Sequence, residues 1–397
     1  MTQALIVMAG AVALWSLLAA RLERWQITAP LAMVVAGIVV GFGTRNTLGE
    51  TLNTKVAQHA AEIVLAVLLF VDATEVRGGL FGPQPRAVFR MLLIALPLGL
   101  GLSVLFGAWL LPGLSWAVLL VIACVVVPID FAPAAFILRD RRIPLRVREV
   151  LNVEGGYNDG IVSPIFIFAL ALAGDASHAT TPMGALGDAL PSAVKAIAVG
   201  VAVGWALSAA TKAAEQHDLM SHQSKRMAMV AAPILTYAVA VGFGGNGFVA
   251  AFVCGLTLNF FRHSTSFHRE LELIDDIGFL LTTAMWFVFG SVAVFSLAEG
   301  HEWRAVLFAI AALTVVRIVP TYLAMIGSHF SMRDRWLLAA LGPRGTTSIV
   351  FGLLAFNGLS GESADLVLLT LVFTVLGSIL LHGAGVPLAA RRHGQAR

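Results

Sequence analysis

VVVPIDFAPAA at residues 125–135 and AALGPRGTTSIVFG at residues 339–352 each place proline and a charged residue inside an apolar run. Proline removes a helix hydrogen bond and clashes with the preceding turn, so each run is predicted to be a broken helix. A break exposes helix ends with partial charges, positive at an N-terminus and negative at a C-terminus. Asp130 and Arg344 are therefore expected to compensate ends of opposite sign. The alternative is a simple proline kink with a charge that faces water.

The composition of the whole chain agrees with such buried breaks. Hydrophobic residues make up 58% of the 397 residues and charged residues 12%, and the mean hydropathy is +0.86. Soluble domains carry about a quarter charged residues, and a helix needs about 20 apolar residues to cross a bilayer. The chain is therefore predicted to be an all-α integral membrane protein. Its formal charge of +3 is attributed to basic loops that face anionic lipid, not nucleic acid.

Hydropathy windows of about 19 residues predict thirteen transmembrane helices. Most of the 26 Lys and Arg residues fall in alternate loops, and the opposite face carries only Arg45, Lys55 and Arg304. Because positively charged loops stay in the cytoplasm, the N-terminus is placed outside and the C-terminus inside. The predicted spans are residues 3–22, 28–43, 58–74, 87–111, 115–138, 149–173, 190–210, 227–244, 246–261, 273–297, 303–325, 336–356 and 364–383.

An odd number of spans permits two inverted six-helix repeats joined by one linking span. The first repeat is then residues 1–173, the linking span 190–210 and the inverted second repeat 227–385, followed by a short cytoplasmic tail at 386–397. In this scheme the broken fifth and twelfth spans are equivalent and cross at mid-membrane. All 397 residues are assigned to a single membrane transport domain.

The sixth span begins with LNVEGGYNDG at residues 151–160, which brings two acids into an apolar run. The spacing places Glu154, Asn158 and Asp159 within roughly one helical face. An ionised carboxylate at low dielectric requires a proton or a cation. Arg317, in the eleventh span, is the expected partner of one acid, which leaves the other to exchange a proton for a cation. Alternatively, both acids merely pair with Arg317 and Arg344.

Other reactive side chains give weaker signals. Ser163 and Ser348 have no histidine partner at membrane depth and no paired-histidine metal motif occurs, so neither an enzyme nor a cofactor is predicted. Cys124 and Cys254 fall inside spans, which argues against a disulfide or a metal site. The ten histidines lie near span ends or in loops, where they suit either pH sensing or, by default, a surface position.

Seven pieces of sequence lie in a fixed order along nearly the whole chain. They are TAPLAMVVAGIVVGFG at 28–43, LLFVDATE at 68–75, PIDFAP at 128–133, RDRRIPLRVREVLN at 139–152, EGGYND at 154–159, Arg317 and GPRG at 342–345. Together they resemble bacterial sodium/proton antiporters of the NhaP-like branch of the monovalent cation/proton antiporter superfamily, and their order is more specific than any one of them.

The resemblance implies a site and a transport mode. Asp159 would be the essential ion- and proton-binding carboxylate, with Asp130 a second one beside it, so that both hold the monovalent cation. Asn158 would be the amide neighbour, and an Asn-Asp pair resembles the electroneutral members of the superfamily. We therefore expect exchange of one cation, most simply sodium, for one proton.

The resemblance also implies an NhaA/NhaP-like fold in the bacterial cytoplasmic (inner) membrane. Glu154 and Arg317 would form a structural ion pair, and Arg344 would stabilise the broken twelfth span. The family is expected to be homodimeric, with one bundle forming the dimer scaffold. The other bundle would hold the site and move as an elevator.

Two positions depart from the family pattern. Ile129 replaces a common threonine and Gly155 replaces a common serine, so two hydroxyl groups near the site are missing. The backbone carbonyls of Pro128 and Ile129, the hydroxyl of Ser163, or water are the expected substitutes. Sodium, lithium and potassium all remain open as the transported ion.

The sequence leaves other functions open and contains further acids near the ends of predicted spans. A potassium/proton antiporter, a sodium-coupled organic-solute symporter and a cation channel are the alternatives. Asp275 and Asp276 suit a cation funnel, a pH sensor or, preferably, a solvated helix start. Asp72 and Glu75 suit either an ion entrance or pairing with Arg77.

Overall fold

The computed structural model describes residues 2–25, 27–76, 81–174, 182–262, 265–299 and 302–385, and this part of the chain is mostly helical with no strand. The predicted tail at 386–397 and Arg77 lie outside the described residues. The elements are α1 (Thr2–Arg24), α2 (Ala29–Leu52), α3 (Lys55–Glu75), α4 (Pro85–Arg90), π-helical η1 (Met91–Ala95), α5 (Leu96–Leu110), α6 (Trp116–Val126), 3-10 helical η2 (Ala132–Ala134), α7 (Phe136–Arg139), α8 (Leu145–Ala173), α9 (Pro182–Gln216), α10 (His222–Gly242), α11 (Gly247–Phe261), α12 (Thr265–Glu299), α13 (Trp303–Leu313), α14 (Val315–Ala324), α15 (Met332–Ala340), α16 (Thr346–Gly358), α17 (Gly361–Ser378) and π-helical η3 (Ile379–Gly385).

Every predicted span overlaps one of these helices or a consecutive set of them. Within the described residues, eight helical segments are long and apolar enough to cross a membrane, and four shorter apolar helices accompany them. Helix α10, which begins with Lys225 and Arg226 in its first turns, belongs to neither set. The all-helical membrane class is confirmed, whereas the count of thirteen spans stays a prediction.

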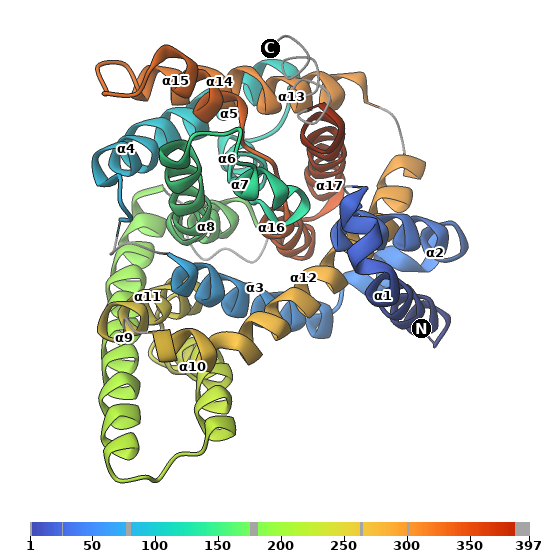
Figure 1. Ribbon diagram of the computed structural model, residues 1–397. Coiled ribbons are helices and arrows are strands. Elements are labelled where there is room, and N and C mark those ends of the chain that lie inside the picture. Colours follow the sequence, from blue (N-terminus) through green and yellow to red (C-terminus); the bar gives the residue numbers. More distant parts are fainter. Residues whose placement is uncertain are drawn as a thin grey trace.

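The helices form two groups (Figure 1). In that view α4–α8 and α13–α17 lie together in the upper part, and α3 and α9–α12 lie below them. Helix α2 packs along α12, and α11 packs against both α3 and α9. Contacts of α3 with α8 and α16, and of α12 with α16 and α17, join the two groups. We call the first group, α4–α8 with α13–α17, the crossing bundle, and the second, α1–α3 with α9–α12, the outer bundle.

Both stretches that opened the analysis leave helical geometry. Helix α6 ends at Val126, and residues 127–131 are not helical before the single turn of η2. Helix α15 ends at Ala340, and residues 341–345 are not helical before α16 begins. The two unwound segments meet, because the Asp130 N–H donates a hydrogen bond to the Pro343 carbonyl at 2.9 Å. Each break is therefore a true interruption of the helix rather than a kink.

Glycines allow α2 and α12 to pack backbone against backbone. A Cβ built on Gly37 overlaps the Phe287 carbonyl oxygen and lies 3.1 Å from the Gly290 Cα. We therefore expect Gly37→Ala to lower the free energy of unfolding by about 1–3 kcal/mol through overpacking. Gly43→Ala, on the same helix with nothing within 4 Å of the new Cβ, is the matched control. Thermal unfolding in detergent tests this, and equal stability of both variants would contradict the close contact.

Candidate functional site

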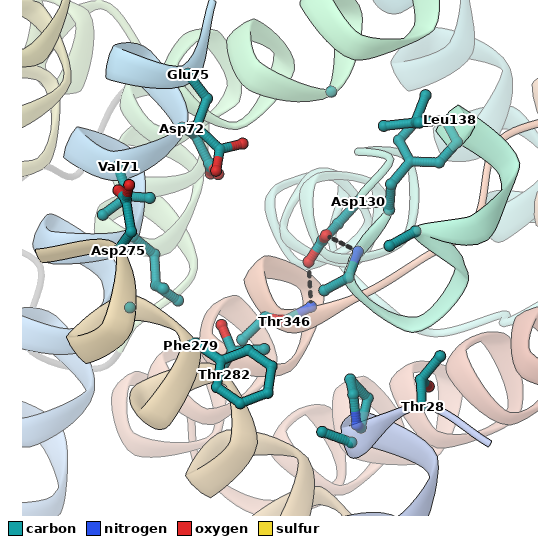
Figure 2. A pocket seen from close by; sticks show the side chains of 18 of the residues that line it. Thr28, Val71, Asp72, Glu75, Asp130, Leu138, Asp275, Phe279, Thr282 and Thr346 are labelled. Carbon is teal, nitrogen blue, oxygen red and sulfur yellow. Dashed lines mark hydrogen bonds between the residues drawn. The ribbon is translucent and has the colours of Figure 1, made fainter. Parts of the chain in front are cut away.

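Asp130 caps the helix that follows the other break. Its Oδ2 accepts a hydrogen bond from the N–H of Thr346, the first residue of α16, at 2.6 Å. Its Oδ1 accepts a second from the Ala132 N–H at 2.7 Å, and Figure 2 shows both bonds as dashed lines. A carboxylate at a helix N-terminus satisfies free N–H groups and complements the positive end of the helix dipole. Asp130 thus links the two broken helices.

Arg344 makes the reciprocal contact with the first broken helix. Its Nε donates to the carbonyl of Val126, the last residue of α6, at 2.5 Å. Its Nη1 donates to the Gly342 carbonyl within its own unwound segment at 2.7 Å. The side chain is 1% exposed, so these carbonyls rather than water accept its hydrogen bonds. The charged residue of each break therefore contacts a helix end at the other break: Asp130 the start of α16, and Arg344 the end of α6.

Glu154 and Arg317 form a buried, two-pronged ion pair between α8 and α14. Arg317 Nη1 donates to Glu154 Oε1 at 2.5 Å, and Nη2 donates to Oε2 at 3.0 Å. Arg317 Nη2 also donates to the carbonyls of Leu338 and Leu341, at 3.0 and 3.1 Å. Leu338 lies in the last turn of α15 and Leu341 begins the unwound segment, so Arg317 ties α8 to the second break.

Asn158 faces the first break. Its Nδ2 donates to the Ile129 carbonyl at 3.0 Å, so this carbonyl is already engaged by the amide. The Asn158 Oδ1 and the Arg317 Nε have no hydrogen-bond partner within the described residues. Both residues border a small cavity of about 20 Å³, a volume that admits one water molecule.

A larger cavity of about 640 Å³ separates the two bundles. Among the described residues, its lining includes six acids and one basic residue, Arg139. Asp159 lies at the inner part of the cavity and is 1% exposed, whereas Glu75 and Arg139 are exposed. The Asp159 Oδ1 has no hydrogen-bond partner among the described residues, and the Thr347 side chain interacts with the carboxyl group. The lining acids are Glu23, Asp72, Glu75, Asp130, Asp159 and Asp275.

Acids from the outer bundle face those of the crossing bundle. Figure 2 shows Asp72 of α3 and Asp275 of α12 on one side of the cavity and Asp130 on the other. The preferred interpretation of Asp275 as a solvated helix start was therefore wrong, because the packing of α12 against α3 turns it into the cavity. Its neighbour Asp276 is exposed and does not line the cavity.

The residues proposed to replace the missing hydroxyl groups do not line the large cavity. Ser163 is buried on α8, where its Oγ donates to the Gly160 carbonyl at 3.1 Å. Neither Ser163 nor Ile129 lines the large cavity. Thr346 and Thr347 do line it, and sequence reasoning did not single them out. Their position directly after GPRG, at the start of the helix that follows the break, is the signal that points to them.

Two further interpretations can be checked against burial. Cys124 and Cys254 are both buried, in α6 and α11. His382, in contrast, was wrongly read as a surface residue. It is 2% exposed, because η3 continues α17 and turns the ring toward the second break.

Comparison with known proteins identifies the family. The model of the sodium/hydrogen exchanger transmembrane family matches residues 8–392. A K(+)/H(+) antiporter NhaP2 from Shewanella sp. strain MR-4 is 24% identical over 381 residues, covering 93% of this chain and 63% of the relative. A Na(+)/H(+) antiporter from Schizosaccharomyces pombe is 24% identical over 369 residues, covering 85% of this chain and 77% of the relative. The chain thus spans 63% of the length of the first of these relatives, which is less than two thirds.

A solved structure gives the same fold. The sodium proton antiporter MjNhaP1 from Methanocaldococcus jannaschii at pH 8 superposes with a TM-score of 0.79, covering 96% of this chain and 99% of that chain at 19% identity. The family match spans nearly the whole sequence and includes both broken helices and the acid-lined cavity. The chain therefore belongs to the sodium/hydrogen exchanger family, a family of secondary transporters and not of enzymes.

Proposed function

We propose that this protein exchanges one monovalent cation for one proton across the membrane, by alternating access at Asp159 and Asp130. The observation that carries the proposal is that no Lys or Arg of the described residues forms an ion pair with Asp159. Arg317 is held by Glu154, and Arg344 by backbone carbonyls of the two breaks. A carboxylate that is 1% exposed at the inner part of a cavity must then hold either a proton or a cation.

Competition at one carboxylate couples the two fluxes. A proton and a cation cannot both neutralise the same carboxylate, so each leaves when the other binds. Asp130 belongs to the same site and faces the same cavity, and the two acids are expected to titrate as a coupled pair. Because Asn158 is uncharged and Glu154 is paired, no further charge needs to move with the cation.

The fold supports the proposed mechanism and topology. We propose thirteen spans in two inverted repeats, residues 1–173 and 227–385, joined by the span at 190–210. The two breaks, which lie in equivalent spans of this scheme, contact each other through Asp130 and Pro343. The cavity between the crossing and outer bundles supports movement of the crossing bundle as an elevator. The proposed setting is the bacterial inner membrane, with the N-terminus outside, the C-terminus inside, and a homodimer surrounded by lipid.

The transported ion is proposed to be sodium, with potassium as the second candidate. The printed names of the relatives support both, because one is a K(+)/H(+) antiporter and another a Na(+)/H(+) antiporter. Proteoliposomes with an imposed pH gradient test the choice when sodium, lithium and potassium are added in turn. We expect one of these cations to dissipate the gradient at a rate that is unchanged when the membrane potential is clamped. A rate that follows the potential contradicts one-for-one exchange, and cation-driven uptake of an organic solute favours the symporter.

The acids on the outer bundle should raise the local cation concentration. We expect Asp275→Asn and Asp72→Asn each to raise the cation KM severalfold with little change in maximal rate, most strongly at low ionic strength. Asp276→Asn, an exposed carboxylate on the next residue of α12 that does not line the cavity, is the matched control. Equal KM values for all three variants and the wild type would show that the outer-bundle acids do not attract the ion.

A further inference from the structure

His382 bridges the end of α17 and the second break from inside the crossing bundle. Its Nε2 accepts a hydrogen bond from the Gly342 N–H at 3.3 Å. Its Nδ1 lies 3.1 Å from the carbonyl oxygen of Ser378. The last helical hydrogen bond of α15 runs from the Leu341 N–H to the Leu337 carbonyl. Gly342 follows it in the unwound segment, so its N–H needs another acceptor. The imidazole supplies one such acceptor.

The contacts assign the tautomer of the ring. Nε2 also lies 3.4 Å from the Ala340 carbonyl. The position of the ring proton therefore decides whether Nε2 accepts from Gly342 or donates to Ala340. With the proton on Nδ1, the ring donates to the Ser378 carbonyl and accepts from Gly342. With the proton on Nε2, the Gly342 N–H faces a second donor. The neutral ring protonated at Nδ1 therefore satisfies both neighbours, and the charged groups that act on it are Arg344 and Arg317.

Ser378 supplies the next acceptor along the same segment. Its Oγ accepts a hydrogen bond from the Arg344 N–H at 2.8 Å, and it lies 3.4 Å from the His382 Nδ1. Both Ser378 and His382 are buried, at 0% and 2% exposure. Ser378 and His382, about one helical turn apart, thus accept hydrogen bonds from two backbone N–H groups of the second break.

The opposite side of this segment holds Asp130. The Pro343 carbonyl accepts from the Asp130 N–H at 2.9 Å, and the Thr346 N–H donates to Asp130 Oδ2 at 2.6 Å. The groups held by His382 and Ser378 therefore alternate along the chain with the groups that orient Asp130. A displacement of the segment at Gly342 or Arg344 moves the hydrogen-bond partners of the Asp130 carboxylate.

We propose that His382 and Ser378 are positioning residues for Asp130: they fix the second break through two backbone N–H groups and thereby set the affinity for the cation. Neither residue lines the large cavity, so neither contacts the ion. The inference rests on the proposed cation/proton exchange, since affinity for the ion is its readout.

The test compares four variants with the wild type in proteoliposomes, using the cation that drives exchange in the wild type. His382→Leu removes both ring contacts, and we expect about a tenfold higher cation KM with a maximal rate within about twofold of the wild type. Ser378→Ala should raise KM in the same direction. His382→Gln should restore a near wild-type KM, because its amide oxygen accepts from Gly342 while its amide nitrogen donates to Ser378. Thr370→Val is the control, since the buried Thr370 hydroxyl donates to the Leu366 and Val367 carbonyls of its own helix, away from the second break.

The outcomes separate this inference from the function on which it rests. A wild-type protein without cation-driven proton flux overturns the proposed function. An active wild type with unchanged KM in His382→Leu and Ser378→Ala overturns the positioning role. A loss of rate in proportion to folded protein, with KM unchanged, shows a purely structural role and overturns it as well. If His382→Leu yields no folded protein, Ser378→Ala and the His382→Gln rescue decide.

Discussion

Asp159→Asn is expected to reduce cation-driven proton flux to that of protein-free vesicles. The amide has nearly the same shape as the carboxyl group, so the buried site keeps its packing. The amide can neither release a proton nor neutralise a cation. Both halves of the exchange need a carboxyl group that does one or the other. The measurement is dissipation of an imposed pH gradient after cation addition, with equal amounts of reconstituted protein.

The control for this variant is an acid on another membrane-spanning helix, α12. Asp276→Asn removes an exposed carboxylate outside the cavity and should leave the flux unchanged. Thermal unfolding in detergent shows whether Asp159→Asn is folded. Full activity of a folded Asp159→Asn protein would rule out carboxylate competition at this position.

Arg317→Met should destabilise the protein by about 3–5 kcal/mol, because it leaves the Glu154 carboxylate buried and unpaired. It also removes the two hydrogen bonds from Arg317 to the end of α15. Glu154→Gln should cost less, since Arg317 keeps those two carbonyls as acceptors. The double variant should be more stable than Arg317→Met alone, because no unpaired charge remains.

Chemical unfolding in detergent micelles measures this coupling. Arg333→Met, which removes an exposed arginine at the start of α15, is the control and should change stability little. Strictly additive effects of Glu154→Gln and Arg317→Met would show that the pair is not coupled, despite the 2.5 Å contact between them.

The sequence predicts the helices and their breaks well because these signals are local. Apolar length marks a span, and proline or glycine beside a charge marks an interruption. The same reasoning missed the π-helical segment η1 in the fourth predicted span and the division of the eleventh at Thr314. Pro97, which offers no backbone N–H, follows η1 by two residues, so the proline was visible but its effect on the preceding turn was not.

The site was harder to predict where it depends on packing between distant helices. The acid of EGGYND and that of PIDFAP stand out because charge is rare in an apolar run. Asp72 and Asp275 lie near span ends, where acids are ordinary, and only the packing of α3 beside α12 brings them to one cavity. His382 looks like an interface histidine for the same reason. Its burial depends on the contact of η3 with the broken helices, which no local pattern encodes.

Proton release on cation binding tests the central claim most directly. The purified protein in weakly buffered detergent solution is titrated with the transported cation while released protons are recorded with a pH indicator. Competition predicts about one proton released per cation bound at a pH where the site is protonated, and an apparent cation Kd that rises as the pH falls. Asp159→Asn should show neither effect. Cation binding without proton release, with a Kd that does not change with pH, would contradict the account.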